Sequence, residues 1–120
     1  MGYALFDPAG TEIEARGEYL GPVTNNVAEY RALIAGMEAA RRHRVERLRV
    51  CMDSELVVRQ MTGEYRVKNE GLKPLYAAAA AARGQLPKVR FVAVPRAENV
   101  RADQLVNETL NEVLGTESPR

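Results

Sequence analysis

Strand-like and helix-like segments alternate along most of this chain, and this alternation limits the possible folds more than any other feature. Residues 2–6 and 11–19 are strand-like runs separated by turn residues at 7–10, which predicts an antiparallel hairpin. From about residue 27 to 44, apolar residues recur three or four positions apart, which predicts an amphipathic helix. Residues 45–52 then alternate between apolar and other side chains, as a strand does.

The same order of strand and helix continues through the second half. The pattern predicts a short helix at residues 54–61, a loop at 62–69, a helix at 72–83, a strand at 88–94 and a last helix at about 99–114. A hairpin followed by alternating strands and helices implies an α/β fold, in which a mixed sheet has parallel later strands and flanking helices. Because 120 residues suit one core, we expect one domain over residues 1–114 and a frayed tail at 115–120.

Composition narrows the class of protein. Seventeen basic and sixteen acidic residues give a net charge of +1, which argues against the broad basic surface of most nonspecific DNA binders but leaves room for a local patch. Cys51 is the only cysteine, so intrachain disulfides and cysteine-rich zinc sites are excluded, and we expect it to be a small core residue. The longest apolar run, residues 75–82, is shorter than the ~18 residues of a membrane span. We therefore expect a cytoplasmic protein with no membrane partner.

Three acidic residues are expected at one edge of the sheet. If the strands at 45–52 and 88–94 run upward, the helices that follow the hairpin and the last strand begin at the top. Glu29 is expected in the first turn of one helix, Asp103 in the first turn of the other, and Asp53 directly after a strand. Oxygen ligands without cysteine suit a hard cation such as Mg²⁺ or Mn²⁺, which is commonly paired with a phosphate-bearing substrate. The pattern therefore indicates phosphodiester chemistry.

Each of these acids also has a purely structural explanation. Glu29 lies three residues after Asn26 and could complete a capping box, a device worth about 1 kcal/mol. Asp53, followed by Ser54, could cap the short helix. Asp103 could be placed favourably against a helix dipole. Taken one at a time, the residues favour the structural explanations.

Four segments, in order, resemble type I ribonuclease H. The first is Thr24-Asn25-Asn26-Val27-Ala28-Glu29-Tyr30 with the following Ala32-Leu33-Ile34, and the others are Asp53-Ser54, Val67-Lys68-Asn69 and residues 99–107. The resemblance extends over residues 2–114. It implies an endonuclease that hydrolyses the RNA strand of RNA/DNA hybrids by two-metal-ion catalysis, with Glu29, Asp53 and Asp103 as catalytic metal ligands. It implies nucleic-acid contacts by Asn25, Asn26, Lys68, Asn69 and Arg96, and recognition of RNA hydroxyls across the minor groove.

One part of the family's pattern is absent from this sequence. In ribonuclease H the domain opens with a central strand that carries an aspartate, followed by a glycine-rich turn, and neither is found here. The resemblance therefore supplies three of the four acids. Asp7 is expected at the bottom of the sheet, as part of a turn, and Glu12 and Glu14 are expected to be solvated surface charges.

The absent central strand would leave hydrogen-bonding groups facing a gap. The strand at residues 2–6 could close against the strand at 45–52, another chain could supply a strand, or the sequence could be a shortened form of a longer product. Because Tyr3, Leu5 and Phe6 make the edge apolar, we expect a homodimer through this exposed N-terminal strand edge.

Three hypotheses of function stay open. The first is a ribonuclease H-type hydrolase, and the second is a catalytically inactive nucleic-acid-binding or protein-interaction module with the same fold. The third is a structural α/β domain whose acids are all helix caps. His43, the only histidine, is expected near the end of a helix, where the helix dipole explains it without a catalytic role.

Overall fold

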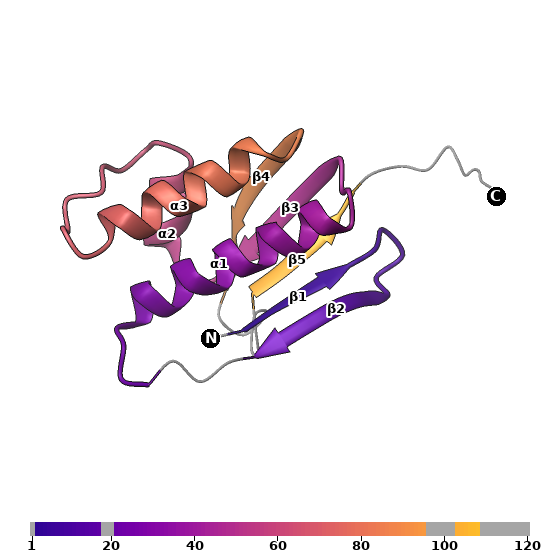
Figure 1. The fold of residues 1–120 in the computed structure, drawn as a ribbon, viewed down its shortest axis with the longest axis horizontal. Helices are drawn as coiled ribbons and strands as arrows, with labels where there is room; N and C mark the ends of the chain where they lie inside the picture. Colours follow the sequence, from indigo (N-terminus) through magenta and orange to yellow (C-terminus); the bar gives the residue numbers. More distant parts are fainter. Residues whose placement is uncertain (1, 18–20, 96–102, 109–120) are drawn as a thin grey trace.

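A five-stranded mixed sheet forms the centre of the computed structural model, which describes residues 2–17, 21–95 and 103–108. The strand order is β2-β1-β5-β3-β4. The strands are β1 (Gly2–Phe6), β2 (Glu12–Gly17), β3 (Arg47–Met52), β4 (Lys88–Ala93) and β5 (Asp103–Asn107). The helices are α1 (Asn25–Arg42), α2 (Glu55–Met61) and α3 (Lys73–Gly84) (Figure 1). The expected α/β fold with an N-terminal antiparallel hairpin and a parallel strand pair, β3 and β4, is confirmed.

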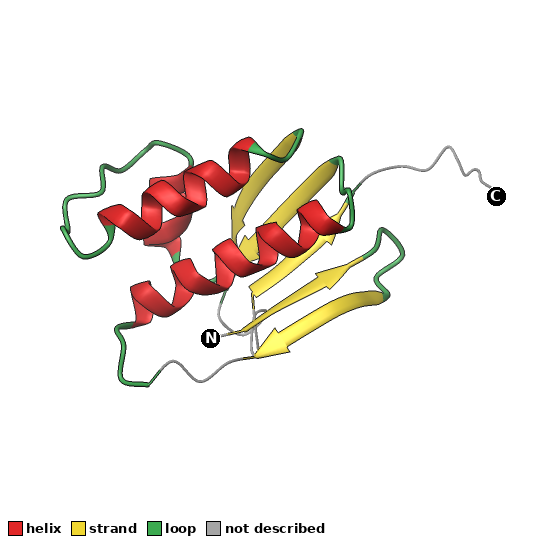
Figure 2. Ribbon diagram, viewed as in Figure 1, coloured by secondary structure: helices red, strands yellow, loops and turns green. Residues whose placement is uncertain are grey.

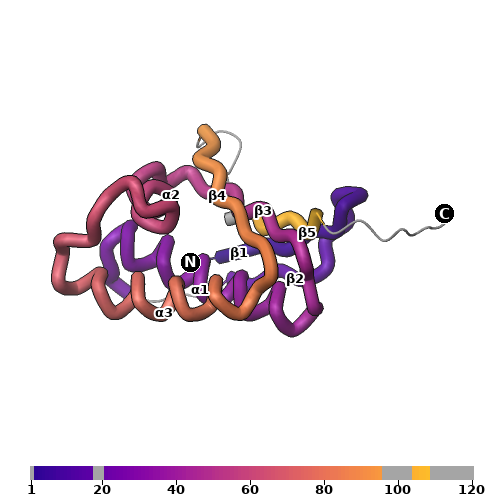
Figure 3. Tube along the Cα trace, turned by 90° about the horizontal axis from the view of Figure 1, so that it is seen from above, coloured from indigo at the N-terminus to yellow at the C-terminus, as the bar shows by residue number. Residues whose placement is uncertain are grey.

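The long helices α1 and α3 lie side by side over one face of the sheet (Figure 2). Seen from above, they lie on the same side of β3, β4 and β5 (Figure 3). Strand residues that face these helices are apolar and fully buried, among them Leu5, Leu48, Val50 and Leu105. Because side chains alternate along a strand, the residues between them, such as Arg47 and Arg49, lie on the other face. Cys51 is buried as expected, and burial raises the pKa of its thiol.

Short side chains set the helix starts. The Thr24 hydroxyl accepts a hydrogen bond from the Val27 backbone N–H, 3.3 Å away, and caps α1. The Ser54 hydroxyl accepts from the Val57 N–H at 3.3 Å and caps α2. Each cap satisfies one of the backbone donors that a helix start leaves without an intrahelical partner. These residues therefore fix where the chain turns from the sheet edge into each helix.

The prediction of a last helix at about 99–114 is wrong for residues 103–107, which form the central strand β5. The flanking residues 99–102 and 109–114 lie outside the described part. β5 runs parallel to β1 and antiparallel to β3, and Leu105 is fully buried between them. A gap between β1 and β3 would leave both strands with backbone groups that lack partners, and filling it outweighs a local preference for helix.

The pairing of β5 with β1 contradicts the expected homodimer through an exposed edge of β1. β1 has strand partners on both sides, β2 and β5, so it offers no edge to a second copy. Tyr3 and Leu5, expected to make that edge apolar, are only 2% and 0% exposed and belong to the core. The gap is filled from within the chain, rather than by β1 closing onto β3 or by a strand from another molecule.

The hairpin turn lies at the end of the sheet away from the C-terminal ends of β3 and β4. Asp7 Oδ1 accepts hydrogen bonds from the backbone N–H groups of Ala9 (2.9 Å) and Thr11 (2.8 Å). Gly10 has a φ of 90°, a conformation that favours glycine. The expectation that Asp7 serves as turn chemistry at the bottom of the sheet is confirmed.

Glu14 is more than the solvated surface charge that we expected. Its carboxylate accepts two hydrogen bonds from Arg42 (3.1 and 3.0 Å) and one from the Tyr3 hydroxyl, and it lies 3.0 Å from His43 Nε2. The bonds from Arg42, Tyr3 and His43 lower the pKa of Glu14 to about 2. Glu14 therefore ties β2 to the C-terminal end of α1, where His43 is the cap residue. The sequence indicated the end of the helix but not this contact.

The packing of Leu105 against α1 predicts a coupled pair of substitutions. A Cβ atom at Gly36 would lie 2.8 Å from both Leu105 methyl carbons. Leu105→Ala should lower the free energy of unfolding by about 2–5 kcal/mol, because it empties a fully buried site. Gly36→Ala should become favourable in that background, because the space is vacant and alanine is a better helix former by about 1 kcal/mol. Urea unfolding of the wild type, both single variants and the double variant measures the coupling, and simple additivity would contradict the contact.

The lowered pKa of Glu14 predicts a pH-dependent contribution to stability. A carboxyl whose pKa falls from 4.5 to about 2 on folding contributes stability above the higher value, and this contribution is lost as pH falls through the lower one. Glu14→Gln should therefore destabilise the protein at neutral pH, and its difference from the wild type should shrink between about pH 5 and about pH 2. Glu12→Gln, at an exposed position on the same strand, is the matched control. A pH-independent difference for Glu14→Gln would contradict the interpretation.

Candidate metal and nucleic-acid site

The C-terminal ends of β3 and β4 and the start of β5 share one edge of the sheet. Asp53 directly follows β3. β5 runs opposite to β3, with Gln104 paired to Cys51, so the first residue of β5, Asp103, lies at the same edge as Asp53. The start of α1 points to this side as well (Figure 1). The element predicted for Asp103 was wrong, yet its backbone is at the predicted edge; its side chain lies outside the described residues.

Glu29 is the fifth residue of α1, beyond its first turn. The helix begins two residues earlier than expected, and Thr24 supplies the cap. A capping box would need its acid at the third helical residue, which is Val27. The capping-box explanation of Glu29 is therefore wrong. The residue is partly buried.

A buried hydrogen bond connects α1, which contains Glu29, to α2, which follows Asp53. The Tyr30 hydroxyl donates to Gln60 Oε1 over 2.6 Å, and both residues are buried. Tyr30 follows Glu29 in α1, and Gln60 belongs to α2, which starts just after Asp53. Burial raises the pKa of Tyr30 to about 12, so its hydroxyl stays a donor at neutral pH. This bond holds α1 and α2 in one arrangement at the side of the molecule where the acids lie.

The structural explanations of the two aspartates also fail. Asp53 is partly buried, its Oδ1 atom is shielded from solvent, and the cap of α2 is the neighbouring Ser54. Asp103 begins a strand, so it is not in the first turn of a helix, as the dipole explanation required. None of the three acids is thus held in place by the capping or dipole role that the sequence allowed. Their role as metal ligands stays a prediction.

The chemistry of the donors fits a hard divalent cation. Glu29 and Asp53 offer carboxylate oxygens, which Mg²⁺ and Mn²⁺ prefer. His43 lies at the far end of α1, against Glu14. Among the described residues no group of three or more acidic, histidine or cysteine side chains is close enough to hold a metal ion. The predicted three-carboxylate site includes Asp103, whose side chain is not among them.

The expected nucleic-acid contacts occupy two regions. Asn25 and Asn26 are the first two residues of α1, and Asn25 is exposed. Lys68 is exposed in the loop between α2 and α3. Asn69 Oδ1 accepts from the Gly71 N–H at 2.8 Å and so shapes this loop. Arg96 lies outside the described residues.

The loop also brings Lys68 together with two cations that were not predicted from the sequence. Arg66 and Lys73 line one hollow with Lys68 and Val67. Lys73 is also paired with Glu70, 2.6 Å away. The signal in the sequence was the spacing of Arg66 and Lys68, which puts two basic residues on one side of an extended segment. The position of Lys73 beside them depends on how α3 packs.

Within the described residues, none of the helices has both the length and the apolar character that a membrane span requires.

Comparison with known proteins identifies the family of this chain. Residues 1–109 match the family described as Reverse transcriptase-like. The bifunctional protein Rv2228c of Mycobacterium tuberculosis is 45% identical over 92 residues, which are 77% of this chain and 25% of that protein. Ribonuclease HI of Halobacterium salinarum is 35% identical over 93% of this chain and 56% of its own length. The chain thus spans about a quarter and about half of these relatives.

Solved structures have the same fold. The N-terminal RNase H domain of Rv2228c is 42% identical with a TM-score of 0.74, covering 77% of this chain and 70% of that one. LC11-RNase H1 in complex with an RNA/DNA hybrid is 32% identical with a TM-score of 0.73, covering 85% and 91%. The chain belongs to the Reverse transcriptase-like family and is a ribonuclease H-like domain.

Proposed function

We propose that this domain is an endonuclease that hydrolyses the RNA strand of RNA/DNA hybrids with two divalent metal ions. The observation that carries the proposal is the edge shared by Asp53 and the backbone of Asp103, on the side where α1 begins. The capping roles considered for Glu29 and Asp53 are filled by Thr24 and Ser54, and Asp103 begins a strand, which adds support. A solved relative, LC11-RNase H1, is in complex with an RNA/DNA hybrid.

Glu29, Asp53 and Asp103 would hold Mg²⁺ or Mn²⁺. When bound, such ions activate the attacking water and neutralise charge on the leaving oxygen. The chain itself orients its carboxylates: Asp53 is anchored between the buried strand β3 and the capped start of α2.

The substrate contacts would be polar and basic. Asn25 and Asn26 present amide groups that can both donate and accept hydrogen bonds, as recognition of RNA 2′-hydroxyls requires. Lys68, Asn69 and Arg96 would contact the sugar–phosphate backbone, which carries no sequence information. We therefore expect cleavage that depends on the hybrid nature of the duplex rather than on its base sequence.

A second candidate is a catalytically inactive module that binds nucleic acid or protein. One observation favours it: the central sheet position is taken by β5, which runs antiparallel to β3 and brings only Asp103 to the edge. Three acids rather than four are then available, and two-metal hydrolysis depends on ligands that the ions share. Activity of the chain decides between the candidates.

Asp53→Asn should abolish cleavage. The change keeps the shape of the side chain and removes its charge, so a loss of at least about a hundredfold, or about 2.7 kcal/mol of transition-state stabilisation, is expected. The assay follows an end-labelled RNA/DNA hybrid in Mg²⁺ and in Mn²⁺. Glu55→Gln is the matched control, because Glu55 is an exposed carboxylate two residues away.

The outcomes separate the hypotheses. Cleavage by the wild type and by Asp53→Asn alike would refute the assigned ligand. Hybrid binding without cleavage in either metal would establish the inactive module. Calorimetry with no Mg²⁺ or Mn²⁺ binding at millimolar concentration, together with no hybrid binding, would leave only a structural domain.

Replacing both helix-start amides should reduce selectivity for RNA. Asn25→Ala/Asn26→Ala should lower the affinity for an RNA/DNA hybrid more than the affinity for a DNA duplex of the same sequence, because only the hybrid presents 2′-hydroxyls. Fluorescence anisotropy in EDTA measures binding without cleavage. Gln85→Ala is the control, because Gln85 is an exposed amide residue at the C-terminal end of α3, away from the start of α1. An equal loss for both duplexes would contradict the role.

A further inference from the structure

The sheet face away from α1 and α3 carries a cluster of cations from two neighbouring strands. We call Arg47, Arg49, Lys88 and Arg90 the basic face. In the parallel register of β3 and β4, Arg47 is opposite Lys88 and Arg49 is opposite Arg90. Leu48 and Val50, the alternating residues of β3, point into the core, which leaves the arginines on the outer face.

Like charges directly opposite each other on paired strands are unfavourable. Two such pairs in succession therefore cost stability unless an anion lies between them. Glu108, just after β5, is the acidic residue that lines the hollows beside these cations. Its two oxygens accept hydrogen bonds from Arg90 Nε (3.0 Å) and Nη2 (2.7 Å), and Arg49 Nε lies 3.4 Å away.

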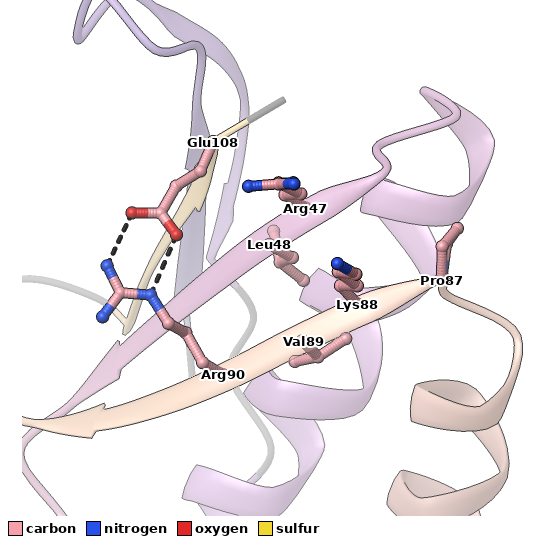
Figure 4. Close-up of a pocket in the computed structure, with 7 residues that line it drawn as sticks. All are labelled: Arg47, Leu48, Pro87, Lys88, Val89, Arg90 and Glu108. Atoms are coloured by element: carbon pink, nitrogen blue, oxygen red, sulfur yellow. Dashed lines mark hydrogen bonds and ion pairs between the residues drawn. The ribbon is translucent and has the colours of Figure 1, made fainter. Parts of the chain in front are cut away.

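The arrangement around Glu108 is that of an oxyanion site. An arginine fork binds carboxylate and phosphate oxygens in the same bidentate way. Figure 4 shows Glu108 held by Arg90 beside Arg47, with Lys88 on the neighbouring strand. These residues line a hollow of about 490 Å³, and a second of about 490 Å³, lined by Arg47, Arg49 and Arg90, adjoins it.

We propose that the basic face binds the phosphate backbone of a nucleic-acid duplex, and that Glu108 competes with phosphate for it. The two cation pairs are two residues apart, about 6.6 Å along the strands, which is close to the spacing of successive phosphates along one nucleic-acid strand. The Arg90 side chain is 60% exposed, so the face is open to an extended ligand rather than closed around a small one.

This surface is separate from the carboxylate edge. Arg47 begins β3 and Asp53 follows its end, so the two lie about 20 Å apart along the strand. A duplex on the basic face contacts residues that take no part in the proposed hydrolysis. Binding here therefore goes beyond the proposed function and survives even if the domain cleaves nothing.

The test compares variants that remove positive charge from the basic face with a variant that removes its negative charge. The affinity for a labelled DNA duplex of about 20 base pairs is measured in EDTA over a range of salt concentrations. Arg47→Gln/Lys88→Gln should weaken binding about tenfold and reduce the slope of log K against log salt by up to about 2. Glu108→Gln should tighten binding about threefold, because it removes the internal competitor. Arg16→Gln/Arg41→Gln, at exposed positions elsewhere, is the charge-matched control and should have the smaller effect.

Thermal unfolding of each variant checks the fold, and Lys88→Gln alone replaces the double variant if the latter is unfolded. Glu55→Gln, at an exposed carboxylate outside both sites, should bind the duplex as the wild type does, and in EDTA this result does not depend on whether the wild type cleaves hybrids. Equal binding by wild type and Arg47→Gln/Lys88→Gln, or weaker binding by folded Glu108→Gln, would overturn the proposal. Saturable binding of inorganic phosphate without duplex binding would also overturn it, since the face would then be a small-anion site.

Discussion

The hydrogen bonds that β5 makes to β1 on one side and to β3 on the other hold the two halves of the sheet together. Without a strand in that position, the hairpin and the β3–β4 pair would each present a row of unpaired backbone groups to the interior. Leu105 completes the same layer, because it fills the space beneath α1 where Gly36 has no side chain. The continuity of the sheet therefore depends on a segment of five residues near the end of the chain.

This pairing also decides what lies at each end of the sheet. Because β5 is antiparallel to β3, its first residue, Asp103, is at the edge where Asp53 follows β3. For the same reason its last residues reach the opposite end, where Glu108 meets Arg49 and Arg90. The position of Asp103 beside Asp53 and the position of Glu108 on the basic face are thus two consequences of one strand direction, separated by the length of β5.

Glu14 and Glu108, both at the end of the sheet opposite Asp53, show how the surroundings of a carboxylate set its role. Glu14 is bound by Arg42, Tyr3 and His43, which lower its pKa, and it closes β2 onto α1. Glu108 is bound by Arg90, which also lowers its pKa, but on a face open to solvent. The first contact links β2 to α1, whereas the second lies on the basic face, where we propose that phosphate competes with Glu108. Both acids depend on arginines distant in sequence, so neither role was visible from local patterns.

Local patterns alone predicted the hairpin, α1, β3, α2, α3 and β4 within a few residues, because turn residues, capping hydroxyls and apolar periodicity act between near neighbours. They also brought Glu29 and Asp53 to the same side, since chain direction follows from the alternation of strands and helices. The ribonuclease H resemblance added the family, which the comparisons confirmed. Residues 103–107 were mispredicted because their periodicity suits a helix, and only the unfilled gap between β1 and β3 makes them a strand. The burial of Tyr3, the contacts of Glu14 and the opposition of Arg47 to Lys88 were likewise decided by the tertiary structure, because strand pairing and register join residues that no local pattern relates.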